Sequence, residues 1–340
     1  MPFRSEAEFV RWLGRRWPRR GPGLALGIGD DGAVVRARPG CDLVLTTDLS
    51  IEDVHFRLDL HPPRAIGHRA LARVLSDLAA MGAKPRFALL SLALARRLTR
   101  SWITAFYDGF GALARRFGVR LIGGDTALVD GATVIDVIAV GEVKGRRALL
   151  RSGARAGDRI YVTGRLGLAA LGLDLLGGGL LEANRRARRA GENRKALGAH
   201  LYPEPRCAAG IELVRMRLAS AAIDVTDGFA ADLARLCAAS GCGAVIREAQ
   251  LPLPQAAPGR DSLELGLRGG EDYELIFTVP VARAARMPQR IGGVMVREVG
   301  EIKAGRRLSL VRADGRQVAL DTRGYDHFRK AGAGHHRTPW

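Results

Sequence analysis

Long apolar segments are missing from this 340-residue chain. No run approaches the ~20 apolar residues that a membrane-spanning helix needs. The nearest candidate, 166–181, is broken by glycines and contains Asp174. Residues 1–16 carry a charge every few positions and lack the apolar centre of a secretory signal. We therefore expect a cytoplasmic protein without a membrane partner.

Cysteine is also scarce. The four cysteines form neither a C-x-x-C pair nor a cluster with histidine: Cys41, Cys207, Cys237 and Cys242. This spacing argues against a zinc site and against a disulfide framework. We expect buried thiols.

The chain has no P-loop, because G-x-x-x-x-G-K-[ST] occurs nowhere in it. The segment "GIGDDG" (27–32) does match G-x-G-x-x-G, the glycine spacing of dinucleotide-binding proteins. That fingerprint requires a strand before the glycines and a helix after them. Here the preceding "RRGPGLAL" is a poor strand, and the following "AVVRARPG" has the character of a strand. The dinucleotide interpretation fails, and the two aspartates of the segment need another explanation.

Basic residues outnumber acidic residues, which gives the chain a formal net charge of +18. The excess is almost entirely arginine and is spread along the chain. The basic segments 15–20, 144–151 and 185–195 are not interleaved with aromatic residues in the way that single-strand binding requires. The charge favours anionic substrates in general, and a nucleic-acid-binding protein remains a remote alternative.

The first half of the chain predicts a sheet with helices. Apolar and β-branched runs predict strands at 42–48, 86–94, 119–125 and 133–143, and helical spacing predicts helices at 63–82 and 102–117. We interpret this half as an α+β domain of order β-α-β-β-α-β, with its helices over one face of the sheet.

A Gly-rich, basic stretch at 144–158 then indicates a boundary, so we expect domains at 1–148 and 149–335. The second half predicts an α/β domain with strands at 159–164, 220–228, 243–248, 273–279 and 307–313. The basic segment 183–196 has weak periodicity, and we expect an exposed helix or a flexible insertion there.

Aspartates recur at the ends of apolar strands. They lie in "GIGDDG" (Asp30, Asp31), "LTTD" (Asp48), "LIGGDT" (Asp125) and "IDVTDG" (Asp224, Asp227), and Asp77 joins them from a helix. Buried carboxylates are costly unless they are paired or bind metal, and Mg²⁺ prefers oxygen ligands together with substrate phosphates. Taken singly, each is better explained as a turn or capping residue, or for Asp77 by an i, i+4 ion pair with Arg73. Together they indicate an enzyme that holds phosphates through several Mg²⁺ ions.

The motifs, taken in order, resemble the thiamine-monophosphate kinase family over almost the whole chain. The matching segments are "GIGDDGAVV", "LTTDLSIEDVHF", "RALARVLSDLAAMGAKP", "LIGGDT", "LLRSGARAGDRIYVTG", "HLYPEPR", "DVTDGFAADL", "GGEDYELIFT" and "GYDHF". The resemblance implies phosphorylation of thiamine monophosphate by ATP to give thiamine diphosphate, with several Mg²⁺ ions. It also implies the two-domain α+β fold of aminoimidazole ribonucleotide synthetase and a homodimer formed by the N-terminal domains.

The resemblance also implies roles for particular residues. The metal ligands that it implies are Asp30, Thr46, Thr47, Asp48, Asp77, Asp125, Asp224 and Asp227. The ATP-binding residues are Tyr107, Gly124, Asp125, Arg151 and Thr226, and the substrate-binding residues are His55, Glu271 and Tyr325. From the residues alone, core packing is the better explanation of Tyr107, and either Glu271 or Asp272 is the residue that faces substrate.

The chemistry implied needs no covalent nucleophile, because a substrate phosphate oxygen is already ionised at neutral pH. We therefore expect direct in-line transfer. The chain departs from the family pattern at Gly32, where alanine is usual, and in the basic segment 183–196. A related ATP-cleaving enzyme of the same superfamily, acting on another acceptor, is the alternative.

Overall fold

The structure is a computed structural model that describes residues 6–17, 20–28, 33–177, 191–255 and 260–325. The chain divides into two compact units. The first unit contains Met1–Leu78 and Ala83–Arg147, and the second contains Ala79–Gly82 and Ala148–Arg337. In the described part of the chain, no helix is long and apolar enough to cross a membrane.

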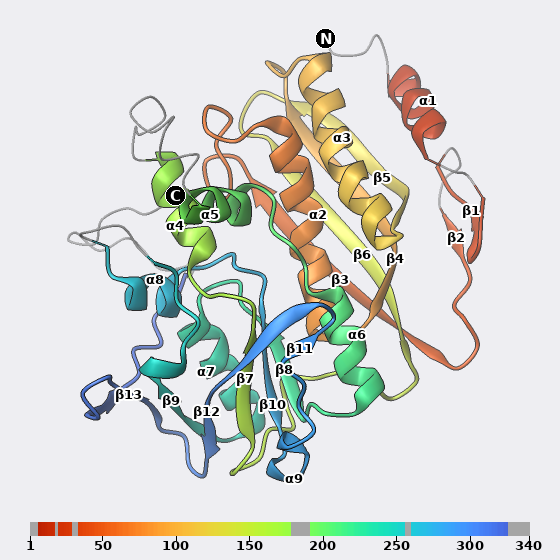
Figure 1. Ribbon diagram of the computed structural model, residues 1–340. Helices are drawn as coiled ribbons and strands as arrows, with labels where there is room; N and C mark the ends of the chain where they lie inside the picture. Colours follow the sequence, from red (N-terminus) through yellow and green to blue (C-terminus); the bar gives the residue numbers. More distant parts are fainter. Residues whose placement is uncertain (1–5, 18–19, 29–32, 178–190, 256–259, 326–340) are drawn as a thin grey trace. The chain divides into compact units, whose positions relative to one another are not determined.

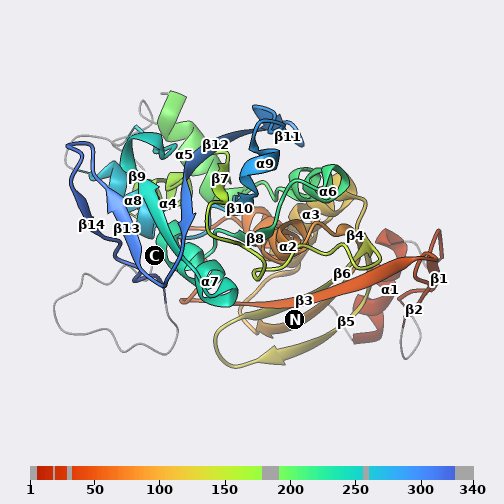
Figure 2. The same ribbon diagram turned by 90° about the horizontal axis from the view of Figure 1, so that it is seen from below.

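A four-stranded sheet forms the centre of the first unit, and two helices cover one of its faces (Figures 1 and 2). In spatial order the strands are β3 (Cys41–Ile51), β6 (Val134–Lys144), β4 (Lys84–Ala95) and β5 (Arg120–Val129). The helices are α2 (Pro63–Ala80) and α3 (Arg100–Phe117). Strands β4 and β5 are parallel, whereas β6 is antiparallel to both of its neighbours.

From β3 to β6 the order of elements is β-α-β-α-β-β, so the expected order β-α-β-β-α-β was wrong although the expected segments themselves follow one another in the observed order. The strand pairing requires the observed order. The parallel pair β4 and β5 needs a crossover, which α3 supplies. Strands β5 and β6 follow each other directly along the chain, and β6 inserts between β3 and β4.

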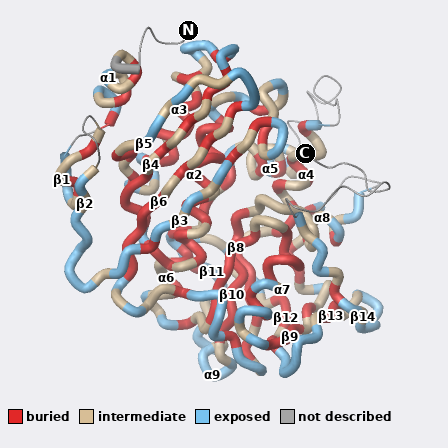
Figure 3. The backbone as a smooth tube through the Cα atoms, turned by 180° about the vertical axis from the view of Figure 1, so that it is seen from behind, coloured by how far each residue is buried: buried red, intermediate tan, exposed pale blue. Residues whose placement is uncertain are grey.

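Helix α2 is buried along most of its length (Figure 3). Glycines let it approach α3 closely, because a Cβ at Gly67 would lie 2.0 Å from the Phe106 carbonyl oxygen. A Cβ at Gly109 would likewise lie 1.9 Å from the carbonyl oxygen of Arg64. This contact fixes α2, which carries several candidate site residues, against its neighbour.

The segment "GIGDDG" (27–32) comes between two short strands in the sequence, β1 (Leu24–Leu26) and β2 (Val34–Val35), which pair antiparallel. A strand, not a helix, follows the glycines, so the rejection of a dinucleotide fingerprint is confirmed. Leu24 packs with Phe87 and Val140 of the sheet. Helix α1 (Glu6–Arg16), which the sequence did not predict, precedes this hairpin.

An eight-stranded sheet forms the second unit. Its path is β14 (Gln317–Ala319), β13 (Leu308–Val311), β9 (Gly243–Arg247), β12 (Val294–Lys303), β7 (Arg159–Thr163), β10 (Leu275–Val279) and β8 (Ala221–Asp224), and β11 (Arg290–Ile291) pairs with β12. The helices are α4 (Leu168–Gly177), α5 (Gly191–Leu201), α6 (Cys207–Met216), α7 (Phe229–Ser240), α8 (Ser262–Arg268) and α9 (Val281–Ala284).

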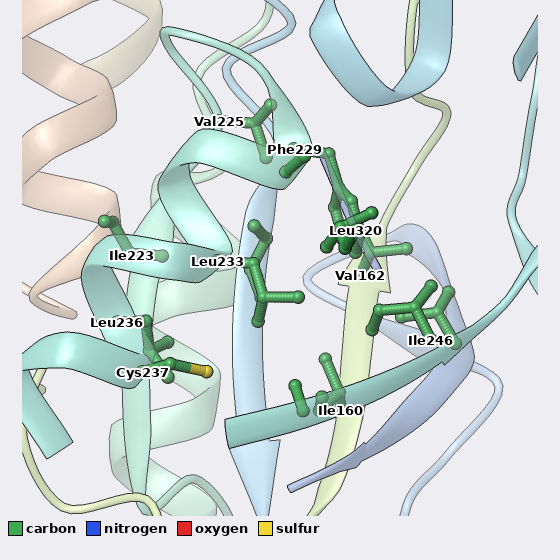
Figure 4. Packing of buried hydrophobic residues seen from close by; sticks show 14 of the residues in the cluster. Ile160, Val162, Ile223, Val225, Phe229, Leu233, Leu236, Cys237, Ile246 and Leu320 are labelled. Carbon is green, nitrogen blue, oxygen red and sulfur yellow. The ribbon is translucent and has the colours of Figure 1, made fainter. Parts of the chain in front are cut away.

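The core of this unit lies between α7 and the sheet. Phe229 and Leu233 of α7 point toward Val162 and Ile246 of the strands (Figure 4). All four side chains are fully buried. Burying a side chain of this size stabilises a fold by about 1.5–3 kcal/mol, so this cluster holds the β8–α7 connection in place.

Strand β12 was missed from the sequence, although it joins β7 to β9. Its apolar pattern is interrupted by charged residues that pair with a neighbouring strand. Arg159 of β7 lies 3.8 Å from Glu298 and 3.1 Å from Glu301. A register shift next to Gly300 breaks the alternation further.

The basic segment 183–196 is described only from residue 191 onward, where it forms the start of α5. Gly191, Arg194 and Lys195 are exposed and Ala196 is fully buried, so the described part of the segment is a helix that is largely exposed and packs through Ala196. Residues 183–190 lie outside the described residues. Three of the four cysteines are buried as expected, and Cys41 is half-buried.

Candidate functional site

Strand alternation brings three predicted metal ligands together in the first unit. Side chains two residues apart on β3 share a face, and Thr46 and Asp48 both reach α2. The Thr46 hydroxyl donates to Asp77 Oδ2 at 2.5 Å. Asp48 Oδ1 accepts from Arg73 Nη2 at 2.9 Å. Because Arg73 and Asp77 lie one turn apart on α2, strand and helix meet through two polar pairs.

These residues fit one particular mode of Mg²⁺ binding. Among the described residues, no group of three or more His, Cys, Asp or Glu side chains is arranged to hold a metal. Mg²⁺ is usually bound through one or two carboxylates plus waters and substrate phosphates, rather than by an all-protein cage. Asp48 and Asp77, with the Thr46 hydroxyl beside them, supply oxygen donors of that kind. Asp30 lies outside the described residues.

Thr47 and Asp125 are not brought to Asp77. Thr47 faces the opposite side of β3, where its hydroxyl donates to Asp136 Oδ1 of β6 at 2.6 Å. Across the sheet, the partner of Asp125 is Ser91, whose other partner is Asp136. Asp125 and Thr47 therefore lie on the sheet face away from the helices. Asp136 was missed, although an acid within the apolar run "VIDVIAV" is a signal for it.

Gly124 is required by the backbone. Its φ of +149° and a virtual Cβ only 1.9 Å from the Leu90 carbonyl oxygen leave no room for a side chain. The glycine brings β5 close to β4 immediately before Asp125, and this close packing fixes the position of the acid.

His55 lies in the turn after β3 and lines a small cavity with Ser50, Phe56, Ile66, Arg69 and Arg73. Its Nδ1 accepts a hydrogen bond from the Ile51 N–H at 3.0 Å, so the neutral ring carries its proton on Nε2. Arg69 donates to the His55 carbonyl oxygen at 3.4 Å. Sequence reasoning missed Arg69 and considered Arg73 only as an ion-pair partner of Asp77, whereas the structure pairs Arg73 with Asp48.

Tyr107 lies in an aromatic core and not at a nucleotide-facing surface. It is 2% exposed and packs edge-on against Phe9, Trp12 and Phe106. Burial raises the pKa of its phenol far above the ordinary value. This position agrees with the packing interpretation rather than with the role in ATP binding that the resemblance implied.

In the second unit, β8 ends at the buried Asp224 and leads into a loop held by α7. Asp232 accepts from the backbone N–H groups of Thr226 and Asp227 at 2.9 and 3.0 Å. Arg235 contacts both Asp227 and Asp232 at 2.5 Å. Burial, together with the nearby Asp227 carboxylate, raises the pKa of Asp232 to about 6. Asp232 shapes the loop that carries Asp224 and Asp227, and the sequence did not single it out.

The "GGEDYEL" segment pairs with this loop through its backbone. The Glu271 N–H donates to the Thr226 carbonyl at 2.8 Å, and the Tyr273 N–H donates to Val225 at 2.9 Å. Tyr325 reaches the same loop, with its N–H 3.4 Å from the Asp227 carbonyl. The predicted residues Thr226, Asp227, Glu271 and Tyr325 are therefore neighbours.

Glu271 is held in an unusual conformation. Its φ of +63° lies in the left-handed region, which is costly for a residue with a side chain. The carboxylate accepts from the Tyr273 hydroxyl at 3.5 Å and lies 3.9 Å from His200 Nδ1. Strain of this kind is concentrated at functional sites, which supports a binding role for Glu271.

Asp272 has a different position. It accepts from the N–H groups of Gly167 and Ala169 at 2.5 and 3.0 Å, at the start of α4. Burial raises its pKa to about 8, against the lowering effect of these two donors. Asp272 thus caps the start of α4 with its carboxylate, which is engaged inside the unit.

Glu274 joins three segments that the sequence had treated separately. It accepts from Arg206 Nε at 2.6 Å and from the Thr163 hydroxyl at 2.6 Å. A Cβ at Gly164 would collide with its carboxylate. The network connects "HLYPEPR" and the end of β7 to the "GGEDYEL" segment.

Arg151 is exposed and lies near the start of β8. Its carbonyl oxygen accepts from the Ser240 hydroxyl at 2.9 Å, and that of Leu150 accepts from the Ala222 N–H at 2.9 Å. The backbone is therefore fixed while the guanidinium is available to solvent, as a phosphate-binding side chain requires.

Two family models match most of the chain. The AIR synthase related protein, N-terminal domain, matches residues 29–143, and the AIR synthase related protein, C-terminal domain, matches residues 155–312. The chain therefore belongs to the class of AIR synthase related proteins, and the expected two-domain α+β fold is confirmed.

Within this class, the thiamine-monophosphate kinase of Bacillus subtilis (strain 168) is 35% identical over 311 residues, covering 89% of this chain and 94% of the relative. The crystal structure of thiamine-monophosphate kinase from Stenotrophomonas maltophilia K279a is similar with a TM-score of 0.77 and 36% identity, covering 90% and 94% of the two chains. AaThiL complexed with AMPPCP and TMP gives a TM-score of 0.73 at 28% identity, covering 95% and 97%. The chain is a member of the thiamine-monophosphate kinase family, which confirms the resemblance.

The raised pKa of Asp272 predicts a pH effect on stability. The folded state holds a proton that the unfolded chain has released above about pH 4, so unfolding releases a proton and stability falls as pH rises toward the folded pKa of about 8. Asp272→Asn removes this group. We expect the stability difference between wild type and variant to fall by up to about 1.4 kcal/mol per pH unit between roughly pH 5 and pH 8.

Denaturant unfolding of both proteins across this range measures the effect. Asp261→Asn serves as control, because Asp261 also caps a helix, α8, through its side chain. Parallel stability profiles for wild type and Asp272→Asn would show that Asp272 is ionised in the folded protein.

Proposed function

We propose that this protein transfers the γ-phosphoryl group of ATP to thiamine monophosphate, giving ADP and thiamine diphosphate. A phosphate oxygen of the substrate forms a bond to the γ-phosphorus while the bond to the β–γ bridging oxygen breaks, and ADP leaves in line. The observation that supports the proposal most is the placement of Thr46, Asp48 and Asp77 by β3 and α2. The AaThiL structure complexed with AMPPCP and TMP supports the same pair of ligands.

The residues present suit a charge-neutralising site. Asp48, Asp77 and Thr46 would hold Mg²⁺ in the first unit, and Asp224 and Asp227 would do so in the second. A bound divalent cation supplies neutralisation of phosphate charge. Thr226 and Arg151 would contact the nucleotide, and His55, Glu271 and Tyr325 the substrate. Thr47, Asp125 and Asp30 stay proposed metal ligands, the first two on the other face of the sheet.

Direct transfer without a covalent intermediate is part of the proposal. A thiol nucleophile must ionise, yet burial raises the pKa of Cys207 to about 12 and that of Cys237 higher still. The substrate oxygen, being ionised already, needs positioning and charge neutralisation more than it needs a base.

Incubation of the protein with ATP, Mg²⁺ and thiamine monophosphate tests the function itself. Formation of ADP and thiamine diphosphate in equal amounts supports it. ATP cleavage without phosphorylation of thiamine monophosphate would favour the alternative, a related ATP-cleaving enzyme with another acceptor. Salt-dependent retention of DNA without Mg²⁺ would favour the remote alternative, a nucleic-acid-binding protein.

Asp77→Asn should lower turnover by about 100-fold or more, because a lost carboxylate charge weakens the neutralisation of the phosphates. The assay is steady-state turnover at saturating Mg²⁺. Asp130→Asn is the matched control, since Asp130 is an exposed residue of the same unit that pairs with Arg96, and it should turn over normally. Near-normal activity of Asp77→Asn would remove Asp77 from the site.

We also propose that the protein is a homodimer formed through the open face of the first unit's sheet. Leu43, Leu45 and Leu49 alternate along β3 on the face away from α2, and they are 42%, 65% and 49% exposed. An exposed apolar stripe of this kind marks an interaction surface. A second copy of the chain would cover it.

Leu45→Glu should therefore convert dimers to monomers, because it puts a charge in the middle of the buried stripe. Size-exclusion chromatography with light scattering measures the mass. The control is Val281→Glu, which changes an equally exposed apolar residue on α9 of the second unit. Dissociation by both variants or by neither would contradict this choice of interface.

A further inference from the structure

Arg73 is a basic residue beside two proposed metal ligands, Asp48 of β3 and Asp77 of α2. It lies on the buried helix α2, its side chain is 15% exposed, and its Nη2 donates to Asp48 Oδ1 at 2.9 Å. Neither its charge nor its position is accounted for by phosphate transfer as proposed above. The guanidinium binds a carboxylate oxygen of the proposed metal site, and a divalent cation at that site would bind the same oxygen.

Arg73 sets the net charge of the group that it forms with Asp48 and Asp77. Without Arg73, Asp48 and Asp77 would be two like charges on facing elements, where the Thr46 hydroxyl donates to Asp77. Like charges in a partly buried cluster are costly. The guanidinium compensates one of them, so the strand and helix can pack in the absence of metal.

We propose that Arg73 is a built-in counter-ion of Asp48, a positioning residue that competes with the divalent cation and thereby sets how tightly the site binds metal. The inference rests on the proposed function in one respect, namely that Asp48 is a metal ligand. Binding of a cation requires Asp48 to give up or share the guanidinium. The cation and Arg73 are therefore negatively coupled, and removal of one strengthens the hold of the other.

Arg73 also lines a small cavity of about 10 Å³ together with His55 and Arg69. A guanidinium that loses Asp48 remains beside this cavity, next to the proposed substrate-binding histidine. The same side chain would then face an anion instead of the carboxylate.

Mn²⁺ binding to the full chain, followed by the electron paramagnetic resonance signal of free Mn²⁺ without ATP or thiamine monophosphate, tests the inference. Arg73→Gln should bind Mn²⁺ roughly threefold to tenfold more tightly than wild type. Arg73→Lys keeps the charge and should stay close to wild type. Without metal, Arg73→Gln should also unfold at lower temperature than wild type, and Mn²⁺ should restore more of its stability.

Two controls make the result specific. Arg64→Gln removes the same charge from the same helix, where Arg64 lies 3.6 Å from Asp108, and it should leave Mn²⁺ affinity unchanged. In an Asp48→Asn background, Arg73→Gln should have no effect, because the shared carboxylate is gone.

Unchanged or weaker Mn²⁺ binding by Arg73→Gln, with Asp48→Asn weakening it, would overturn the role of Arg73 and leave the metal site intact. Mn²⁺ affinity that is insensitive to Asp48→Asn would instead remove Asp48 from the metal site on which the proposed function relies, and formation of thiamine diphosphate would still decide the function itself. The two failures are therefore distinguishable.

Discussion

The hydrogen bond from Thr46 to Asp77 joins the strand and the helix on which the rest of the first unit's candidate site depends. It exists because side chains two apart on β3 face α2 together, so that Thr46 and Asp48 meet Asp77 and Arg73. The close contact of α2 with α3 at Gly67 keeps the helix from shifting. Polar pairing and tight packing thus act together, and a change in either would move the carboxylates.

In the second unit, backbone hydrogen bonds hold the candidate site residues in place. Thr226 binds Glu271 through main-chain atoms, and Asp232 fixes the loop by accepting two N–H groups. The Glu274–Arg206 pair anchors the segment that contains the strained Glu271. Rigid elements with buried partners hold the groups that face solvent, which is the arrangement that binding of charged phosphates requires.

Much of the fold and of the candidate site could be predicted from the sequence, and the features that were missed have physical reasons. Asp48, Asp77 and Asp224 were proposed as ligands because carboxylates next to apolar strands are costly without a partner, and the structure places Asp48 and Asp77 in polar pairs between β3 and α2. The opposite orientations of Thr46 and Thr47 follow from the period of a strand, but the resemblance assigned both residues to one metal site. Strand β12 was missed because Glu298 and Glu301 are paired across the sheet. The capping role of Asp272 depends on N–H groups about a hundred residues away along the chain, which no local pattern reveals.

The central claim is that Asp48 and Asp77 hold a divalent cation against the phosphates of the nucleotide. Crystals of the protein grown with Mn²⁺ and the ATP analogue AMPPCP, measured for anomalous scattering, test it most directly. The account predicts a Mn²⁺ peak at about 2.1 Å from carboxylate oxygens of Asp48 and Asp77, with nucleotide phosphate oxygens completing the coordination. Mn²⁺ bound with neither carboxylate, while AMPPCP is present, would contradict it.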